Sequence, residues 1–520
     1  MKKTILYILL LPLLLSCKQE IKRPNFLVIL TDDQRPQTLG CYDASCPIKT
    51  PHIDALATDG IRFTQGFVTT PICAVSRASI FTGRYSSSTG MTRFHKQMPD
   101  SIFNHTYNMY LQQSGYYTGQ VGKYGVASTK EQHARIDFFQ GQASQGPAFR
   151  QYKGREVHDS EWLALQTSDF LDSVPEGQPF CLQLNYKAPH FSSKPAPEDK
   201  GALADYSFTR HPLDNDEVAA TVPEFVRGSF LDVCYREVFN KEGDHNPFSR
   251  DYYEKVMSLD RSVGRVRQML EERGLADNTI IIYLSDHGAH FGDRHFYGKW
   301  SPYDPSLKIP FIVYDPRPQG RKQEVRDEMV LNIDIAPTLL ELAGVDVPEI
   351  MDGRSLTPLF DSKKKMKEEW RNHFYFEHYQ SNARSGYYIA RNEGVRTLDA
   401  KYLRWLDMPD PIEEYYNLKD DPYEINNLFA NSKEQMRVKQ LKVQFENWRK
   451  EHPDNYEYNP YIFHPTTNSP DIDWKRFKEV RPEVYEDIAR QVKRLKVTWE
   501  QAVDDWDIRH KISKKANYWY

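Results

Sequence analysis

The chain has 520 residues, enough for one large domain with a smaller companion or for several ordinary domains. Its formal net charge is −4, charged residues make up 27%, and its basic runs, such as 363–365, are short. This charge balance argues against a nucleic acid partner, because no strong positive field is available to hold a phosphate backbone.

The first 17 residues resemble a bacterial lipoprotein signal peptide. Lys2 and Lys3 precede an apolar run at 5–15, which is too short to span a bilayer comfortably, and the small residue Ser16 precedes Cys17. The resemblance implies cleavage before Cys17 and lipidation of its sulfur, which would anchor an exported protein to a bacterial membrane, in the periplasm or at the cell surface. The alternative is an ordinary signal peptide with an incidental cysteine, and in both cases the protein leaves the cytoplasm.

With Cys17 assigned to the anchor, an odd number of cysteines remains, so a simple disulfide framework leaves at least one thiol to explain. The remaining cysteines are Cys41, Cys46, Cys73, Cys181 and Cys234. Cys41 and Cys46 are candidates for a disulfide in an oxidising compartment, although closeness in sequence does not prove pairing.

Short apolar runs alternate with helix-like stretches over the first two thirds of the chain. An apolar run of this length, bounded by polar residues, is typical of a strand buried on both faces of a parallel sheet. The runs lie at 25–30, 180–184, 279–284 and 310–314, and the helical stretches lie at 54–57, 161–171, 252–273 and 333–343. The alternation predicts an α/β fold with a large mixed, mainly parallel sheet sandwiched by helices, and we assign it to residues 24–370.

The character of the sequence changes near residue 371, where aromatic-rich segments begin. Alternating and aromatic segments at 373–379, 386–391 and 401–405 favour an antiparallel sheet, and helices are predicted at 433–450 and 482–506. Residues 371–520 are therefore predicted to form a smaller C-terminal α+β domain.

Acidic residues follow two of the predicted strands directly. Asp32 and Asp33 follow the first strand, and Asp286 and His287 follow the third. Ligands gather at the carboxyl edge of such sheets. The Asp32–Asp33 pair alone is more typical of a turn than of a site, but three carboxylates at one edge would repel each other without a cation. The oxygen donors favour Ca²⁺ or Mg²⁺, whereas a nitrogen ligand from His287 would favour a transition metal.

The segment TTPICAVSRASIFTGRY, at 69–85, is the most specific motif. It resembles the signature of the type I sulfatases, within the alkaline-phosphatase superfamily: a cysteine, an arginine four residues later, here Arg77, and then Thr-Gly-Arg. The resemblance implies that a maturation enzyme oxidises Cys73 to formylglycine. The sequence departs from the signature at Val75, where the family usually has proline, within the stretch that the maturation enzyme reads.

Further segments resemble landmarks of this family in the same order. They lie at 115–125, 187–190, 298–316, 332–344, 352–356 and 415–428. The resemblance implies that residues 24–370 form the catalytic domain and that one divalent metal, usually Ca²⁺, is bound by Asp32, Asp33, formylglycine 73, Asp286 and His287. It also implies that Arg77 holds the formylglycine, that Lys123, His190 and Lys299 surround the sulfate, and that His190 or Lys299 protonates the departing alcohol.

The expected chemistry agrees with these residue types. A sulfate monoester spreads negative charge over its oxygens, so nucleophilic attack needs fixed positive groups around it. The hydrate of formylglycine offers one hydroxyl to attack the sulfur and a second to expel the sulfate afterwards. The family's usual histidine for that second step is replaced by Gly125, so the base stays unassigned, with Lys123 and His95 as candidates.

The sequence thus predicts a sulfatase, a sulfuric ester hydrolase. Because export and anchoring suit a substrate too large to enter a cell, we expect that substrate to be a sulfated polysaccharide or oligosaccharide. Two alternatives stay open: a phosphoester hydrolase of the same superfamily, and an inactive glycan-binding lipoprotein that uses its aromatic residues as sugar platforms.

Overall fold

The structure is a computed structural model. It describes residues 22–453 apart from 362, 367, 381–388 and 407–410, together with 486, 489, 490, 493 and 496. The signal peptide predicted at 1–17 and nearly all of the helix predicted at 482–506 lie outside the described residues. Among the residues described, no helix has both the length and the apolar character needed to cross a membrane.

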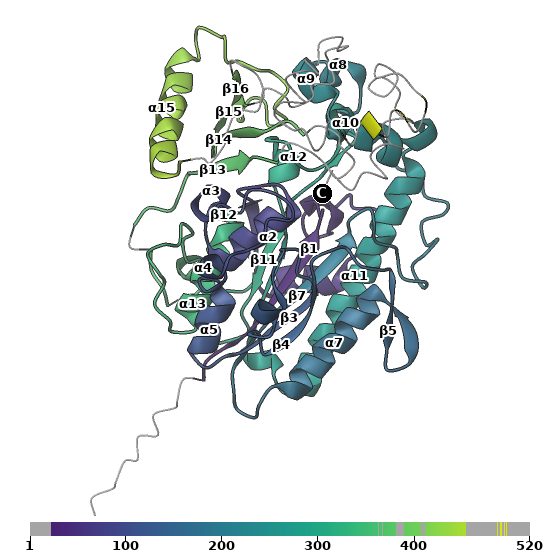
Figure 1. Ribbon diagram of the computed structural model, residues 1–520, viewed down its shortest axis with the longest axis vertical. Helices are drawn as coiled ribbons and strands as arrows, with labels where there is room; N and C mark the ends of the chain where they lie inside the picture. The colour runs from purple at the N-terminus through teal and green to yellow at the C-terminus, as the bar shows by residue number, and fades with distance from the viewer. Residues whose placement is uncertain are drawn as a thin grey trace, which may run out of the picture.

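An eight-stranded sheet forms the centre of the molecule, with strand order β12-β2-β11-β8-β1-β7-β3-β4 (Figure 1). Its strands are β1 (Asn25–Asp32), β2 (Ile61–Phe67), β3 (Tyr117–Lys123), β4 (Phe138–Gln142), β7 (Phe180–Pro189), β8 (Thr279–Ser285), β11 (Phe311–Tyr314) and β12 (Glu324–Leu331). Neighbouring strands run parallel except at β11, which is antiparallel to both β8 and β2. The predicted mixed, mainly parallel sheet is confirmed.

Helices cover both faces of this sheet, as the apolar runs predict. In β1, Phe26, Val28 and Leu30 belong to one hydrophobic cluster, whereas Leu27 and Ile29 belong to another. The first cluster includes residues of α2 (Cys73–Thr82), α5 (Tyr107–Gln113) and α13 (Ile335–Leu342). The second includes residues of α1 (Pro51–Asp59), α7 (Asp159–Ser173) and α11 (Asn246–Glu272). Strand β1 therefore lies in the middle layer, buried on both sides.

The remaining short elements lie in the connections of this larger part. The helices are α3 (Ser86–Thr89), α4 (Asp100–Phe103), α6 (Lys130–His133), α8 (Asp216–Ala219), α9 (Glu224–Arg227), α10 (Phe230–Cys234), α12 (Asp304–Leu307) and α14 (Thr357–Phe360). Two small hairpins pair β5 (Phe149–Tyr152) with β6 (Arg155–His158), and β9 (His290–Phe291) with β10 (Tyr297–Gly298).

A second, antiparallel sheet follows in the chain, in the order β13-β14-β15-β16, and α15 (Gln435–Glu451) packs against it (Figure 1). Its strands are β13 (His373–His378), β14 (Asn392–Thr397), β15 (Ala400–Trp405) and β16 (Ile412–Asn417). The strand predicted at 386–391 falls partly outside the described residues, and the observed strand begins at Asn392. Buried side chains of this sheet, such as Phe374 and Trp405, join the first hydrophobic cluster of the central sheet, so the two sheets share one core.

The five cysteines of the described residues are free thiols. Cys41 and Cys46 therefore do not form the disulfide considered above. Burial raises the pKa of Cys46, and burial together with Asp54 raises the pKa of Cys41, so both thiols are held in the protonated form.

Candidate active site

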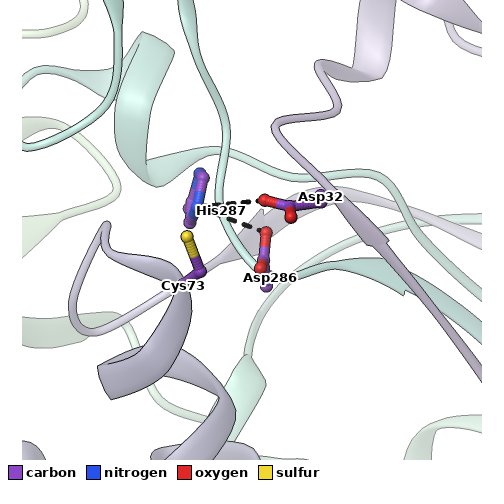
Figure 2. A group of neighbouring side chains, drawn as sticks. All are labelled: Asp32, Cys73, Asp286 and His287. Atoms are coloured by element: carbon purple, nitrogen blue, oxygen red, sulfur yellow. Dashed lines mark ion pairs between the residues drawn. The ribbon is translucent and has the colours of Figure 1, made fainter. Parts of the chain in front are cut away.

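The parallel pairing of β1 with β8 brings the predicted acidic residues together. Thr31 lies opposite Ser285, and the Asp286 backbone N–H donates to the Thr31 carbonyl at 3.0 Å, so Asp32 and Asp286 leave the sheet side by side. Both carboxylates are fully buried. Figure 2 shows them converging with His287 and Cys73.

This cluster has the properties of a cation site. One ligand atom each from Asp32, Cys73, Asp286 and His287 lies within 4.8 Å of the others. Among the described residues, Asp32 Oδ1, Asp286 Oδ1 and His287 Nε2 are buried without a hydrogen-bond partner. Burying such atoms unsatisfied is costly, and carboxylate oxygens suit a hard divalent cation. The residues present therefore fit the predicted metal.

Cys73 is the first residue of α2, and its side chain is only 5% exposed. Its Sγ lies 3.1 Å from Lys299 Nζ. Burial raises the pKa of the Cys73 thiol, although Lys299 opposes this effect. In the mature enzyme expected from the motif, Sγ would be replaced by the oxygens of the formylglycine hydrate. Those oxygens would then lie between the acidic cluster and a fixed ammonium group.

Asp33 has a left-handed backbone (φ 62°) and contacts both His287 and Lys299. Its Oδ1 is 3.0 Å from Lys299 Nζ and 3.2 Å from His287 Nδ1, and its Oδ2 is 3.5 Å from His190 Nε2. Ligand atoms of Asp32, Asp33 and His190 form a second group within 4.8 Å. Asp33 thus joins the metal cluster to the two residues predicted to protonate the leaving group.

The predicted cationic groups contact the acidic residues. Arg77, fully buried, donates from Nε to Asp286 Oδ2 at 2.8 Å and from Nη1 to the Lys123 carbonyl. Lys123, the last residue of β3, donates from Nζ to Asp32 Oδ2. Burial opposes ionisation of Asp286, but His287, Arg77 and Lys123 outweigh it and hold the pKa of this carboxyl below its usual range. The Asp286 carboxyl is therefore held in the ionised form that metal binding requires.

The structure gives a steric reason for glycine at position 125. Its φ is +79°, and a Cβ built on it would lie 2.6 Å from Arg77 Cδ. The side chain of Arg77 therefore passes where the family's usual histidine would begin. With Arg77 in this position, there is no room for a side chain at residue 125.

His190 follows β7 and is held in one tautomer. The Ser192 backbone N–H donates to His190 Nδ1 at 3.2 Å, so the proton of the neutral ring sits on Nε2, the nitrogen that faces Asp33. Burial, then the charges of Lys299 and Lys123, lower the pKa of His190 well below its usual value. The ring therefore presents an N–H to the centre of the site.

Residues without a sequence signal also reach the site. Gln145, in the connection after β4, donates from Nε2 to Asp32 Oδ2 at 3.3 Å, and Asn185 of β7 accepts from Arg77 Nη1 at 3.4 Å. Lys255 of α11 donates from Nζ to the Phe191 carbonyl at 3.4 Å. None of these belongs to a motif, so sequence reasoning had no pattern with which to find them.

The segment that carries Lys299 is fixed to the C-terminal sheet by buried charges. Asp304 accepts from Arg396 Nη2 at 2.8 Å and from Lys401 Nζ at 2.7 Å. The Asp304 backbone N–H donates to Glu424 at 2.8 Å, and Asn392 Nδ2 donates to the Trp300 carbonyl at 3.1 Å. The second sheet therefore supports one wall of the site.

Comparison with known proteins places this geometry in a family. Residues 24–345 match the Sulfatase family, and residues 292–451 match the family described as N-sulphoglucosamine sulphohydrolase, C-terminal. The chain belongs to the sulfatase family. It is accordingly a sulfuric ester hydrolase, and members of this family generally use a metal ion and a formylglycine.

Several relatives match this sulfatase over most of their length. An N-acetylglucosamine-6-O-sulfatase of Bacteroides thetaiotaomicron is 29% identical, over 86% of this chain and 91% of the relative. An arylsulfatase of Clostridium perfringens is 26% identical, over 81% of this chain and 93% of the relative. The second family match, over residues 292–451, includes the C-terminal sheet.

Solved structures show the same fold. One, of a protein in complex with its substrate D-glucosamine-2-N,6-O-disulfate, has a TM-score of 0.74 and 26% identity over 84% of this chain and 99% of the other. A phosphonate monoester hydrolase of Silicibacter pomeroyi has a TM-score of 0.67 at 21% identity, over 83% and 96%. At that identity the second likeness concerns the fold alone.

Proposed function

We propose that this sulfatase removes sulfate from a glucosamine unit of a sulfated polysaccharide or oligosaccharide, with a formylglycine formed from Cys73 as nucleophile and Ca²⁺ as metal. The observation that carries the proposal is the meeting of Cys73 Sγ, Lys299 Nζ and the buried Asp32–Asp286–His287 cluster at one edge of the sheet. A nucleophile, a fixed cation and a metal site at one place are what sulfate-ester cleavage requires.

The metal would be held by Asp32, Asp286, His287 and residue 73, and Asp33 is the further predicted ligand beside them. When bound, it supplies a positive charge that polarises the sulfate and favours ionisation of a hydroxyl at residue 73. Mg²⁺ is the alternative, since both ions prefer oxygen ligands.

The chain's own residues have separate tasks around the substrate. Lys299 and Lys123 place ammonium groups near the sulfate oxygens, and Arg77 fixes Asp286. Asp33 and Asp286 outweigh burial and hold the pKa of Lys299 above its usual value, so Lys299 stays charged. The charged Lys299 can therefore give the departing alcohol its proton, and the neutral His190 presents its Nε2–H as a hydrogen-bond donor to the same oxygen.

The sugar class is supported by two relatives. The printed names of one sequence relative and of one structural relative refer to sulfated glucosamines, and the structural likeness covers 84% of this chain. Export through a lipoprotein signal, with Cys17 lipidated and the enzyme held at a bacterial membrane, suits a large extracellular glycan. A formylglycine-generating enzyme would be needed as the maturation partner, and Val75 lies in the segment that it would read.

The proposal is tested by assaying the enzyme from its maturing host on four substrates: 6-O-sulfated N-acetylglucosamine, 2-N,6-O-disulfated glucosamine, an aryl sulfate and an aryl phosphate. We expect sulfated glucosamine to give the highest kcat/KM, and the Cys73→Ala variant to be inactive on all four. Mass spectrometry of the peptide around residue 73 checks for the aldehyde. A preference for the aryl phosphate would favour the phosphoester hydrolase, and an unmodified Cys73 thiol in an inactive protein would favour the glycan-binding lipoprotein.

A further inference from the structure

An exposed aromatic ring lies against His190. Phe191 follows His190 at the end of β7, and its ring stacks on the imidazole with centroids 4.6 Å apart and an interplanar angle of 28°. Phe191 is nevertheless 44% exposed. One exposed apolar side chain is ordinary on a protein surface. Phe191 is of interest because it lies beside His190, a residue predicted to contact the substrate.

The backbone that presents this ring is rigid. The His190 carbonyl accepts from the Ser193 backbone N–H at 2.9 Å and from Ser193 Oγ at 2.7 Å. The Phe191 carbonyl accepts from Lys255 Nζ, and the Lys194 carbonyl lies 3.0 Å from His158 Nε2. Because the turn is fixed on both sides of Phe191, the ring would lose little conformational freedom when a ligand covers it.

The orientation of His190 places the substrate next to this ring. Its Nε2 points inward, 3.5 Å from Asp33 Oδ2, and the ring of Phe191 covers one face of the imidazole and continues to solvent. An alcohol oxygen that accepts a hydrogen bond from Nε2 must lie beside the imidazole. The carbon skeleton attached to that oxygen would then extend outward, past the exposed ring of Phe191.

We propose that Phe191 is the stacking platform for the sugar ring that carries the sulfate ester. A sugar ring has an apolar C–H face as well as polar edges, and ligand sites typically combine an aromatic wall with a few oriented polar groups. Here Phe191 supplies the wall, and His190 and Lys299 supply the polar groups. The inference rests on the proposed sugar substrate and adds the residue that selects for a ring.

The test separates binding of the ring from binding of the sulfate. We expect Phe191→Ala to raise KM for sulfated glucosamine about tenfold, as expected for the loss of one aromatic contact of roughly 1.4 kcal/mol. The inhibition constant of inorganic sulfate, which has no ring, should stay within about twofold, and so should kcat, because the sulfate-binding groups are unchanged. Phe191→Trp should keep KM near the wild-type value, whereas Phe191→Leu should behave like Phe191→Ala.

Phe149 offers a matched control, since it is 42% exposed and packs edge-on against a different histidine, His158, with centroids 5.5 Å apart. Phe149→Ala should leave the KM for sulfated glucosamine and the inhibition constant of inorganic sulfate unchanged. If Phe191→Ala lowers kcat and also weakens the binding of inorganic sulfate, Phe191 merely positions His190 and the proposed stacking platform is wrong. If the KM of Phe191→Ala for the sugar is unchanged, the stacking platform is wrong, but the proposed substrate class is not affected. A wild-type enzyme that cleaves aryl sulfate but no sulfated sugar contradicts the substrate class and the platform together.

Discussion

At the scale of single residues, Gly125 and Arg77 are the most informative pair. A side chain at position 125 meets Arg77 Cδ at 2.6 Å, and Arg77 holds Asp286 through Nε at 2.8 Å. We therefore expect Gly125→Ala to displace Arg77 and lower kcat about a hundredfold, the typical cost of a misplacement near 1 Å in an active site. Steady-state kinetics on the preferred sulfate ester would measure this loss.

Gly154 is the control for backbone strain. Its φ is +84°, close to that of Gly125, but a Cβ there would have no heavy atom within 4 Å. Both alanine variants should lose roughly 1 kcal/mol of stability from the left-handed conformation, while only Gly125→Ala loses activity. Equal activity in the two variants would contradict the proposed role of Arg77.

His378 gives a prediction for pH. Burial, and to a smaller extent Arg391, lower its pKa to about 3, although a backbone contact with Gln380 opposes this. The folded state therefore binds fewer protons at His378 than the unfolded state between about pH 3 and 6.5, so its contribution to stability is complete above about pH 6.5 and falls below it. In urea unfolding at pH 7.5 and 5, His378→Gln should lose less stability between the two pH values than the wild type. An equal loss would show that His378 is not buried as a neutral ring.

At the scale of elements, the segment between β8 and α12 shows how the site is held. Arg294, His295 and Trp300 have positive φ values without being glycine, and such backbone persists only where the surroundings determine it. Within the segment, Arg294 donates from Nη2 to the Tyr423 and Glu424 carbonyls. At its end, Arg396 and Lys401 of the C-terminal sheet hold Asp304. These ion pairs fix the segment that places Lys299 beside residue 73.

We expect Lys401→Met to lower kcat about tenfold or more and to leave the fold intact at moderate temperature. Lys401 is fully buried, and removing one partner of a buried ion pair costs roughly 3–5 kcal/mol. Arg404→Met is the matched variant, because Arg404 lies in the same strand but pairs with Glu393 and Glu446. It should lower the denaturation midpoint with little change in kcat, and Lys401→Arg should recover most of the activity.

The sequence predicts those elements whose burial leaves a clear pattern. Strands β1 and β8 are buried on both faces and therefore show continuous apolar runs, and in the run at the start of β7 only Gln183 is polar. Strand β2 contains Arg62, Thr64 and Gln65 and was not predicted, because polar residues interrupt its apolar pattern. The antiparallel direction of β11 depends on the path of the chain between strands, which no local pattern records.

The same contrast holds for the site. Cys73, Lys123 and Lys299 were found because they occupy ordered motifs, and the structure brings all of them to one edge of the sheet. Contacts such as Gln145 to Asp32, or Lys401 to Asp304, join residues from distant parts of the chain. They follow from the three-dimensional arrangement alone, so the support given by the C-terminal sheet was not predicted.

At the scale of the whole molecule, the two sheets share one hydrophobic core, and Asn392 of the second sheet donates to the Trp300 carbonyl, next to Lys299 at the catalytic edge. The buried carboxylates at this edge would be stabilised by a cation that binds only when both β1 and β8 are folded. Metal binding and folding should therefore be coupled. Removing the metal should destabilise the protein as a whole rather than one loop.

We expect Ca²⁺ to raise the melting temperature of protein treated with a chelator. A ligand at a hundredfold excess over its Kd stabilises the folded state by about 2.7 kcal/mol, and for a chain of 520 residues this corresponds to a shift of roughly 2–3 °C. Asp286→Asn removes one of the carboxylates that face the cation and should abolish the shift, whereas Asp137→Asn, which alters an acid that accepts from Thr118 instead, should keep it. Because the measurement is thermal, it does not require the enzyme to be active. Equal melting temperatures with and without Ca²⁺ would show that the Asp32–Asp286–His287 cluster does not bind this ion.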